Sequence, residues 1–144
     1  MPSKFLLDEN LQGDSFYSVL EAAGIYVVRC RDEGFEGTED AIWIPAAAQL
    51  GYVIVSGDQR QRYRAWEKEA LVRSGARVLH VVMGKHVTHP ELAQNFVNTY
   101  EAIERFIKRT KPPFVATIVR PHLEADLQAG KPGRILRKQL PSAV

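Results

Sequence analysis

Residues 52–58 read Tyr-Val-Ile-Val-Ser-Gly-Asp, an apolar run that stops at a turn and a carboxylate. A nearly continuous apolar run is typical of a strand that is covered on both faces, as in a parallel sheet. Ser56 and Gly57 supply the turn, and Asp58 follows them directly. The stretch therefore predicts a buried parallel strand that delivers an acid at its carboxyl end.

Strand-like and helix-like segments alternate along the rest of the chain. The predicted strands occupy residues 4–8, 25–28, 52–55, 77–82 and 114–119, and the predicted helices occupy residues 14–23, 38–50, 60–74 and 90–110. The longest helix has apolar residues at helical spacing, from Leu92 through Phe96 to Ile107. This alternation predicts an α/β fold in which a mainly parallel sheet of about five strands has helices on both faces.

The helix expected over residues 38–50 contains a proline. Thr38 is the predicted N-cap. Pro45 is expected to kink the helix or to divide it into two short helices. The predicted buried positions are Ala41, Ile42, Ala46 and Leu50.

The alternating pattern stops near residue 120. We therefore expect one domain over residues 1–120 and a basic C-terminal tail over residues 121–144. The segment 130–141 is rich in Gly, Pro, Lys and Arg, which is typical of a mobile, solvated tail. Contact of its basic residues with RNA phosphates or with an acidic partner is the alternative.

The composition limits the class of protein. A chain of 144 residues with 45% hydrophobic and 25% charged residues suits one soluble domain. The net charge of +2 is too small to establish a nucleic-acid partner by itself. A single cysteine, Cys30, excludes an internal disulfide and a multi-cysteine zinc site. Without a secretory signal or an apolar run near about 20 residues, the expected location is cytoplasmic, with no membrane contact.

Three aspartates stand at the ends of predicted strands or at a helix start: Asp8, Asp40 and Asp58. Each has an ordinary structural explanation, because Asp stabilises turns and a carboxylate favours the first turn of a helix. Together they would converge at the carboxyl edge of a parallel sheet, where such folds bind ligands. Converging carboxylates repel one another unless a cation neutralises them, and oxygen ligands suit Mg²⁺ or Mn²⁺. Such a site suits phosphodiester hydrolysis.

Three stretches around these acids resemble motifs of PIN-like domains. Phe5-Leu6-Leu7-Asp8-Glu9-Asn10-Leu11 resembles their opening strand, and Thr38-Glu39-Asp40-Ala41-Ile42-Trp43-Ile44-Pro45 resembles their second acidic motif. Val53-Ile54-Val55-Ser56-Gly57-Asp58 resembles the strand and acid that Arg or Lys usually follows. Over roughly residues 4–110, the order of the motifs is most similar to toxins of the VapC type from bacterial toxin–antitoxin pairs.

The resemblance implies a three-layer α/β/α fold and a Mg²⁺- or Mn²⁺-dependent endoribonuclease that cleaves RNA by metal-activated water. It gives the catalytic and metal-binding roles to Asp8, Asp40 and Asp58. Glu9, Glu39 and Asn10 are the expected supporting residues around them. An antitoxin protein is the implied partner, and the sequence leaves a homodimer open.

The sequence departs from the family after its third acid. Many PIN domains carry a further acid there, whereas this chain continues with Gln59-Arg60-Gln61-Arg62. The sequence therefore leaves open whether a second metal ion binds and whether turnover is efficient. Arg60, Arg62 and Tyr63 are candidate RNA-binding residues, because arginine suits phosphate and tyrosine can stack on a base. A solvated helix face is the alternative for these three residues.

Two other classes of protein remain open at this stage. A PIN-like domain without activity would bind RNA or protein, and the missing fourth acid favours this alternative. A receiver-like phosphoryl-transfer domain would also gather acids at strand ends, but it needs a lysine at the end of a late strand, and Lys85 comes only after Met83-Gly84. His80, Cys30 and Trp43 are interpreted as buried residues of the core or of an interface.

Overall fold

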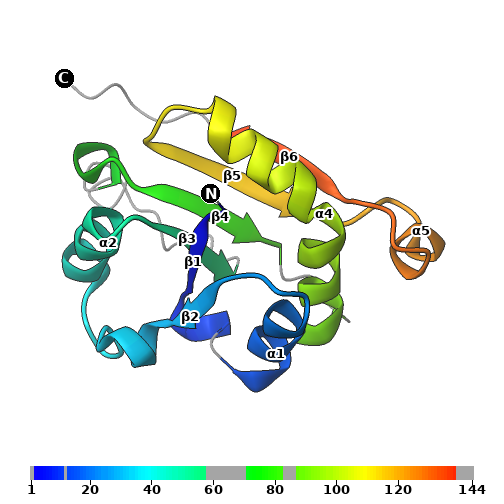
Figure 1. Ribbon diagram of the computed structural model, residues 1–144, viewed down its shortest axis with the longest axis horizontal. Coiled ribbons are helices and arrows are strands. Elements are labelled where there is room, and N and C mark those ends of the chain that lie inside the picture. The colour runs from blue at the N-terminus through cyan, green and yellow to red at the C-terminus, as the bar shows by residue number, and fades with distance from the viewer. Residues whose placement is uncertain (1, 12, 58–70, 83–86, 139–144) are drawn as a thin grey trace.

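The computed structural model describes residues 2–11, 13–57, 71–82 and 87–138. Its elements, in chain order, are β1 (Lys4–Leu7), η1 (Glu9–Leu11), α1 (Asp14–Ala22), β2 (Val27–Arg29), η2 (Cys30–Glu33), α2 (Asp40–Gln49), β3 (Tyr52–Gly57), β4 (Arg77–Val81), α4 (His89–Arg109), β5 (Phe114–Val119), α5 (Glu124–Gln128) and β6 (Arg134–Lys138), where η marks a 3₁₀ turn (Figure 1). No helix in these described ranges is both long and apolar enough to cross a bilayer.

The described strands form one sheet in the order β2-β1-β3-β4-β5-β6. The first five strands are parallel, and β6 runs antiparallel to β5. The predicted α/β fold with a mainly parallel sheet is therefore confirmed, and β6 adds an antiparallel strand to the five that the sequence indicated.

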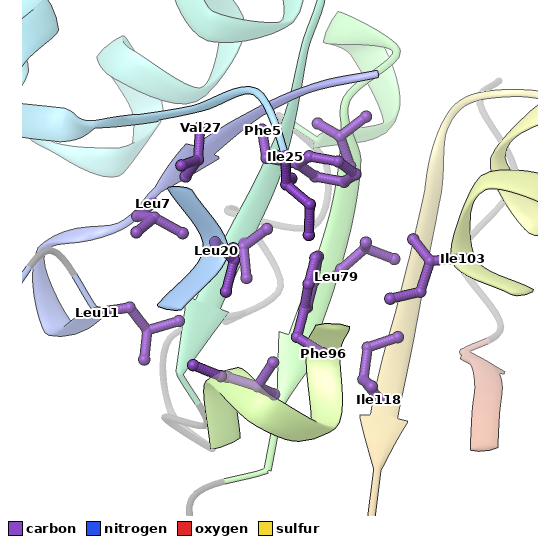
Figure 2. Packing of buried hydrophobic residues seen from close by; sticks show 14 of the residues in the cluster. Phe5, Leu7, Leu11, Leu20, Ile25, Val27, Leu79, Phe96, Ile103 and Ile118 are labelled. Atoms are coloured by element: carbon purple, nitrogen blue, oxygen red, sulfur yellow. The ribbon is translucent and has the colours of Figure 1, made fainter. Parts of the chain in front are cut away.

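The strands bury both of their faces, as the apolar runs predicted. On one face, Phe5 and Leu7 of β1 pack with Phe96 of α4 and Leu20 of α1 in a single apolar cluster (Figure 2). On the other face, Leu6 packs in a second cluster with residues of α2. The three layers are thus α1 and α4, the sheet, and α2.

The crossovers that carry α1 and α4 have opposite hands. α1 connects β1 to β2 and steps toward one edge of the sheet, whereas α4 connects β4 to β5 and steps toward the other edge. Both helices nevertheless pack on the same face. The α2 crossover returns from β2 to β3 over the opposite face and so shares the hand of the α1 crossover. Because about 98% of such crossovers are right-handed, β4–α4–β5 is the exception.

Helix α2 differs from its prediction in three ways. Its N-cap is Glu39 rather than Thr38, and Pro45 lies inside one uninterrupted helix. The helix buries Trp43, Ile44 and Ala47, while Ile42 and Leu50, which were expected to be buried, are 61% and 51% exposed. Pro45 lacks a backbone donor, but the buried residues before and after it hold the helix together despite the missing bond.

The segment after residue 120 differs from the expected mobile tail. It contains α5 and then β6, which pairs with β5 from Val119↔Arg134 to Val115↔Lys138. Gly133 leads into β6 and donates its amide to the hydroxyl of Thr99 on α4 at 2.9 Å. A Cβ at Gly133 would lie 2.0 Å from the carbonyl oxygen of Val119, so only glycine fits this approach.

The start of β1 is tied to α4 by Glu104. Its carboxylate accepts hydrogen bonds from the amide of Ser3 at 2.9 Å, the hydroxyl of Ser3 at 2.6 Å and the hydroxyl of Tyr100 at 2.7 Å. Partial burial alone would raise the pKa of Glu104, but these hydrogen bonds outweigh it and lower the pKa from its usual value. Burial and the bond to Glu104 together raise the pKa of Tyr100 to about 12.

Candidate active site

The chain reverses its direction of travel along the sheet between β1 and β3. From β1 it steps outward to β2, and from β3 it steps to β4 on the opposite side. Neighbouring strands whose connections leave in opposite directions open a crevice at their carboxyl ends, which is where open α/β sheets bind ligands. Asp8 follows β1 at this point, and Ser56 and Gly57 end β3.

Asp8 is buried in this crevice, with 1% of its surface exposed. One carboxylate oxygen accepts a hydrogen bond from the amide of Glu9 at 2.6 Å. The other accepts one from the hydroxyl of Ser56 at 2.9 Å. A buried carboxylate is costly unless it is hydrogen-bonded or paired with a cation. These two donors therefore fix the orientation of the Asp8 side chain at the end of β1.

Asn10 closes the same edge through a pair of hydrogen bonds to one residue. Its side-chain nitrogen donates to the carbonyl of Gly57 at 3.3 Å, and its side-chain oxygen accepts from the amide of Gly57 at 3.0 Å. The pair holds the turn after β1 against the end of β3. The contact therefore fixes the last residue of β3. Asp58, the third predicted acid, is the next residue in the sequence.

Glu9 reaches from the same turn to the segment before α2. Its carboxylate accepts a hydrogen bond from the amide of Gly37 at 2.7 Å. Gly37 has a φ of +77°, a conformation that favours glycine. The bond holds the approach to Glu39, the exposed N-cap of α2, and to Asp40, the first residue of that helix. The side chains that were expected to support the acids thus include two, Glu9 and Asn10, that brace the ends of neighbouring segments.

A polar row crosses the sheet next to Asp8. Ser56 is the strand partner of His80, and His80 is the partner of Thr117. Two residues earlier on the same face, the corresponding positions of these strands are apolar. Ser56 is fully buried and His80 is 4% exposed, so polar groups form the floor of the crevice on the α2 side. The burial expected of His80 is confirmed, but its neighbours are polar.

Sequence reasoning missed the part played by Ser56. It was interpreted as turn chemistry, whereas its hydroxyl bonds to Asp8 from the neighbouring strand. The register of β1 against β3 explains this contact. Leu7 pairs with Val55, so Asp8 and Ser56, the next residues of the two segments, lie side by side. Cys30 and Trp43 are buried as expected, and both belong to the cluster under α2.

Several predicted site residues cannot be placed. Asp58, Arg60, Arg62 and Tyr63 lie outside the described residues, and of Asp40 only the backbone is described. Within the described part, no group of three or more His, Cys, Asp or Glu side chains could hold a metal ion. The convergence of three aspartates therefore stays a prediction, and the described geometry places Asp8, Glu9 and Asn10 at the crevice.

The donor chemistry at the crevice fits a hard divalent cation. Asp8 offers carboxylate oxygens, which the Glu9 amide and the Ser56 hydroxyl hold in place. Oxygen ligands of this kind suit Mg²⁺ or Mn²⁺, whereas the nitrogen and sulfur ligands of a zinc site are not grouped in the described residues. Asp8 supplies oxygen donors of this kind, but the described residues do not complete a metal site around it.

A family model described as a PIN like domain matches residues 3–82, which is more than half of the chain. The match runs from the start of β1 through the end of β4 and so includes the whole crevice. Helix α4, β5, α5 and β6 lie beyond it. Neither a curated protein nor a solved structure matches the chain significantly.

Proposed function

We propose that this chain, which belongs to the PIN-like domain family, is a divalent-metal-dependent endoribonuclease. The observation that carries the proposal is the buried carboxylate of Asp8 at the point where the sheet connections reverse, bonded to the end of β3 through Ser56. A divalent ion that cleaves a phosphodiester needs oxygen ligands held in place, and the Glu9 amide and the Ser56 hydroxyl hold the Asp8 carboxylate at this point of the sheet.

Asp8, Asp40 and Asp58 are the proposed metal ligands, with Mg²⁺ or Mn²⁺ as the ion. When bound, such an ion lowers the pKa of a water molecule and stabilises negative charge on the phosphate. Ser56 and the Glu9 amide orient Asp8, and Glu9 holds the segment that leads into Asp40. Arg60 and Arg62 would neutralise substrate phosphates, and Tyr63 would stack on a base.

The proposed role in the cell is that of a toxin held inactive by an antitoxin. A nuclease of this kind needs its crevice covered, and a chain with a net charge of +2 favours an acidic partner segment. We expect the antitoxin to cover the crevice near Asp8 and Asp58. Copurification from the native operon followed by crosslinking tests this, and contacts that map only to the amino ends of the strands would contradict it.

The test of the ribonuclease proposal is an incubation of the purified full chain with RNA in Mg²⁺ or Mn²⁺, with EDTA as the metal-free control. The expected result is internal cleavage that needs the ion and that Asp8→Asn removes. Cleavage that persists in EDTA would contradict metal dependence. RNA binding without cleavage in either metal would favour the alternative, a PIN-like binding module.

A further inference from the structure

A hollow lies at the carboxyl end of β5, away from the crevice at Asp8. Its volume is about 260 Å³, and it opens between the first turn of α4 and the segment from β5 into α5. In Figure 1, α5 lies beyond the end of the β5 arrow and beside the start of α4. The side chains that matter for its chemistry are Val87, Glu91, Arg120, His122, Glu124 and Leu127.

The hollow exists because of the last part of the chain. The exceptional hand of the β4–α4–β5 crossover brings the start of α4 to the α1 side of the carboxyl edge. Leu127 is buried there, and its carbonyl accepts a hydrogen bond from Asn98 of α4 at 3.4 Å, which holds α5 in place. Every lining residue lies beyond residue 82, outside the part of the chain that the family model matches.

The hollow and the crevice share the carboxyl edge of the sheet. Asp8 follows β1, and β5 is the third strand along from β1, past β3 and β4. Three strand spacings amount to about 14 Å, a distance that a few nucleotides of single-stranded RNA span. An RNA strand that lies along this edge with one phosphate at Asp8 would therefore bring a nearby base to the hollow.

The charges in the hollow suit a base better than a phosphate. Glu91 and Glu124 contribute two carboxylates, Arg120 contributes a guanidinium group and His122 an imidazole. Among the described residues, no hydrogen bond or ion pair joins any of these four side chains to a neighbouring side chain. Two carboxylates disfavour a phosphate group, whereas carboxylates and a guanidinium together offer both acceptors and donors to the edge of a base.

We propose that this hollow binds a guanine base of the RNA substrate and so selects where the chain cleaves. The proposal rests on the ribonuclease function proposed above. Guanine presents two adjacent donors, N1–H and the 2-amino group, which a single carboxylate can accept together. Its O6 and N7 accept from arginine, the commonest specific contact to guanine in nucleic-acid recognition. Cytosine and adenine each present only one amino group beside an acceptor.

The size of the hollow supports a single base as the ligand. Pockets for drug-sized ligands begin at roughly 300 Å³, so a volume of about 260 Å³ suits a smaller group. Sequence-specific RNA recognition works mainly on unstacked single-stranded bases, which a protein can hydrogen-bond on their edges and stack on side chains. Arg120 or His122 provides the planar group for stacking.

The test measures binding to the full chain without metal, so that it does not depend on cleavage. Calorimetry would compare guanosine 5′-monophosphate with inosine 5′-monophosphate, which lacks the 2-amino group, with adenosine 5′-monophosphate and with inorganic phosphate. We expect guanosine monophosphate to bind about tenfold or more tightly than the other three. The double variant Glu91→Gln/Glu124→Gln should lose this preference, and Glu101→Gln, an exposed site on the same helix, should keep it.

A second arm uses short RNA oligonucleotides with and without one guanine. If the guanine-containing RNA binds at least as tightly as the free nucleotide, the hollow takes a base of an RNA substrate. If only the free nucleotide binds, this role is wrong. Equal binding of all nucleotides, or of phosphate alone, would overturn the guanine site. If RNA is cleaved in metal but guanine is not preferred, the ribonuclease proposal stands and the hollow proposal fails. Guanine binding without any cleavage in metal would support the guanine site and contradict the ribonuclease proposal.

Discussion

Replacement of Asp8 by Asn should abolish RNA cleavage and leave the fold intact. The asparagine oxygen can still accept from the Glu9 amide, which Asp8 does at 2.6 Å. Its amide can donate to Ser56, whose hydroxyl proton can turn to the carbonyl of Gly57 at 3.2 Å. The Glu9 amide and the Ser56 hydroxyl therefore each keep a partner, while the negative charge that a metal ion requires is removed.

The expected change in stability is small for this reason. A hydrogen bond to a charged group is worth about 1.5–3 kcal/mol and a neutral one about 0.5–1.5 kcal/mol, so two weakened bonds cost roughly 2–3 kcal/mol. Removal of an ionised group that is 1% exposed returns a free energy of similar size. The free energy of unfolding should therefore change by about 1 kcal/mol or less in the absence of metal.

Asp8→Ala provides the contrast. It leaves the Glu9 amide and the Ser56 hydroxyl without their acceptor, at about 1–3 kcal/mol for each buried group. Denaturant unfolding of both variants and of wild type gives the stabilities, and cleavage of labelled RNA in Mn²⁺ gives the activities. Asp14→Asn is the matched control, because its carboxylate is 85% exposed and only forms surface ion pairs with Arg29 and Arg31; it should leave cleavage unchanged and alter stability by about 1 kcal/mol or less.

Two results would refute this reasoning. If Asp8→Asn is as unstable as Asp8→Ala, the carboxylate is needed for the fold and its burial requires no cation. If Asp8→Asn cleaves RNA as wild type does, the carboxylate takes no part in the chemistry.

Other predictions concern the last part of the fold, the acid range and the RNA path. Gly133→Ala should destabilise the protein by about 1–3 kcal/mol or more in denaturant unfolding, because its Cβ would meet the Val119 carbonyl; an unchanged stability would mean that β6 adds nothing to the fold. The lowered pKa of Glu104 should add stability that is complete above its unfolded value of 4.5 and is lost as the pH falls through the folded value, and Glu104→Gln should remove this part of the acid dependence. Arg60→Ala with Arg62→Ala should weaken RNA binding and flatten its dependence on salt while Mn²⁺ binding survives; an unchanged slope would place both arginines on a solvated face.

The sequence predicted best the elements whose burial is continuous or regular. The strand over 114–119 was predicted with its observed bounds, because an almost continuous apolar run admits few other placements. The helix expected over 90–110 is observed as His89–Arg109, because its apolar stripe repeats over many turns. Asp8 was placed at a strand end for the same reason, since the run before it stops abruptly.

The local sequence pattern predicted structure poorly in two cases: where a helix has apolar residues on all its sides, and where a strand pairs with a segment far away in the sequence. In α2, Ile42, Trp43 and Ile44 are consecutive, so helical spacing could not tell the exposed Ile42 from its buried neighbours. β6 was missed because an edge strand is covered on one side only, and its position depends on a fit of Gly133 against β5.

The polar floor of the crevice depends on strand order and register. Ser56 and His80 are 24 residues apart in the sequence, and they become neighbours only because β3 pairs with β4 in one particular register. The contact of Ser56 with Asp8 similarly requires β3 to lie beside β1 rather than on the far side of β2. A single sequence shows that these residues lie in strands, but it does not show which strands are neighbours or in which register they pair.

The most direct test of the central claim is a titration of Mn²⁺ into the metal-free wild-type chain, Asp8→Asn and Asp14→Asn, followed by calorimetry and by the electron paramagnetic resonance signal of free Mn²⁺. If the crevice holds the catalytic ion, wild type and Asp14→Asn bind Mn²⁺ with equal affinity, and Asp8→Asn binds it at least about tenfold more weakly. Equal affinity in all three proteins, or no saturable binding by wild type, would contradict the claim that the buried carboxylate at the end of β1 is a metal ligand.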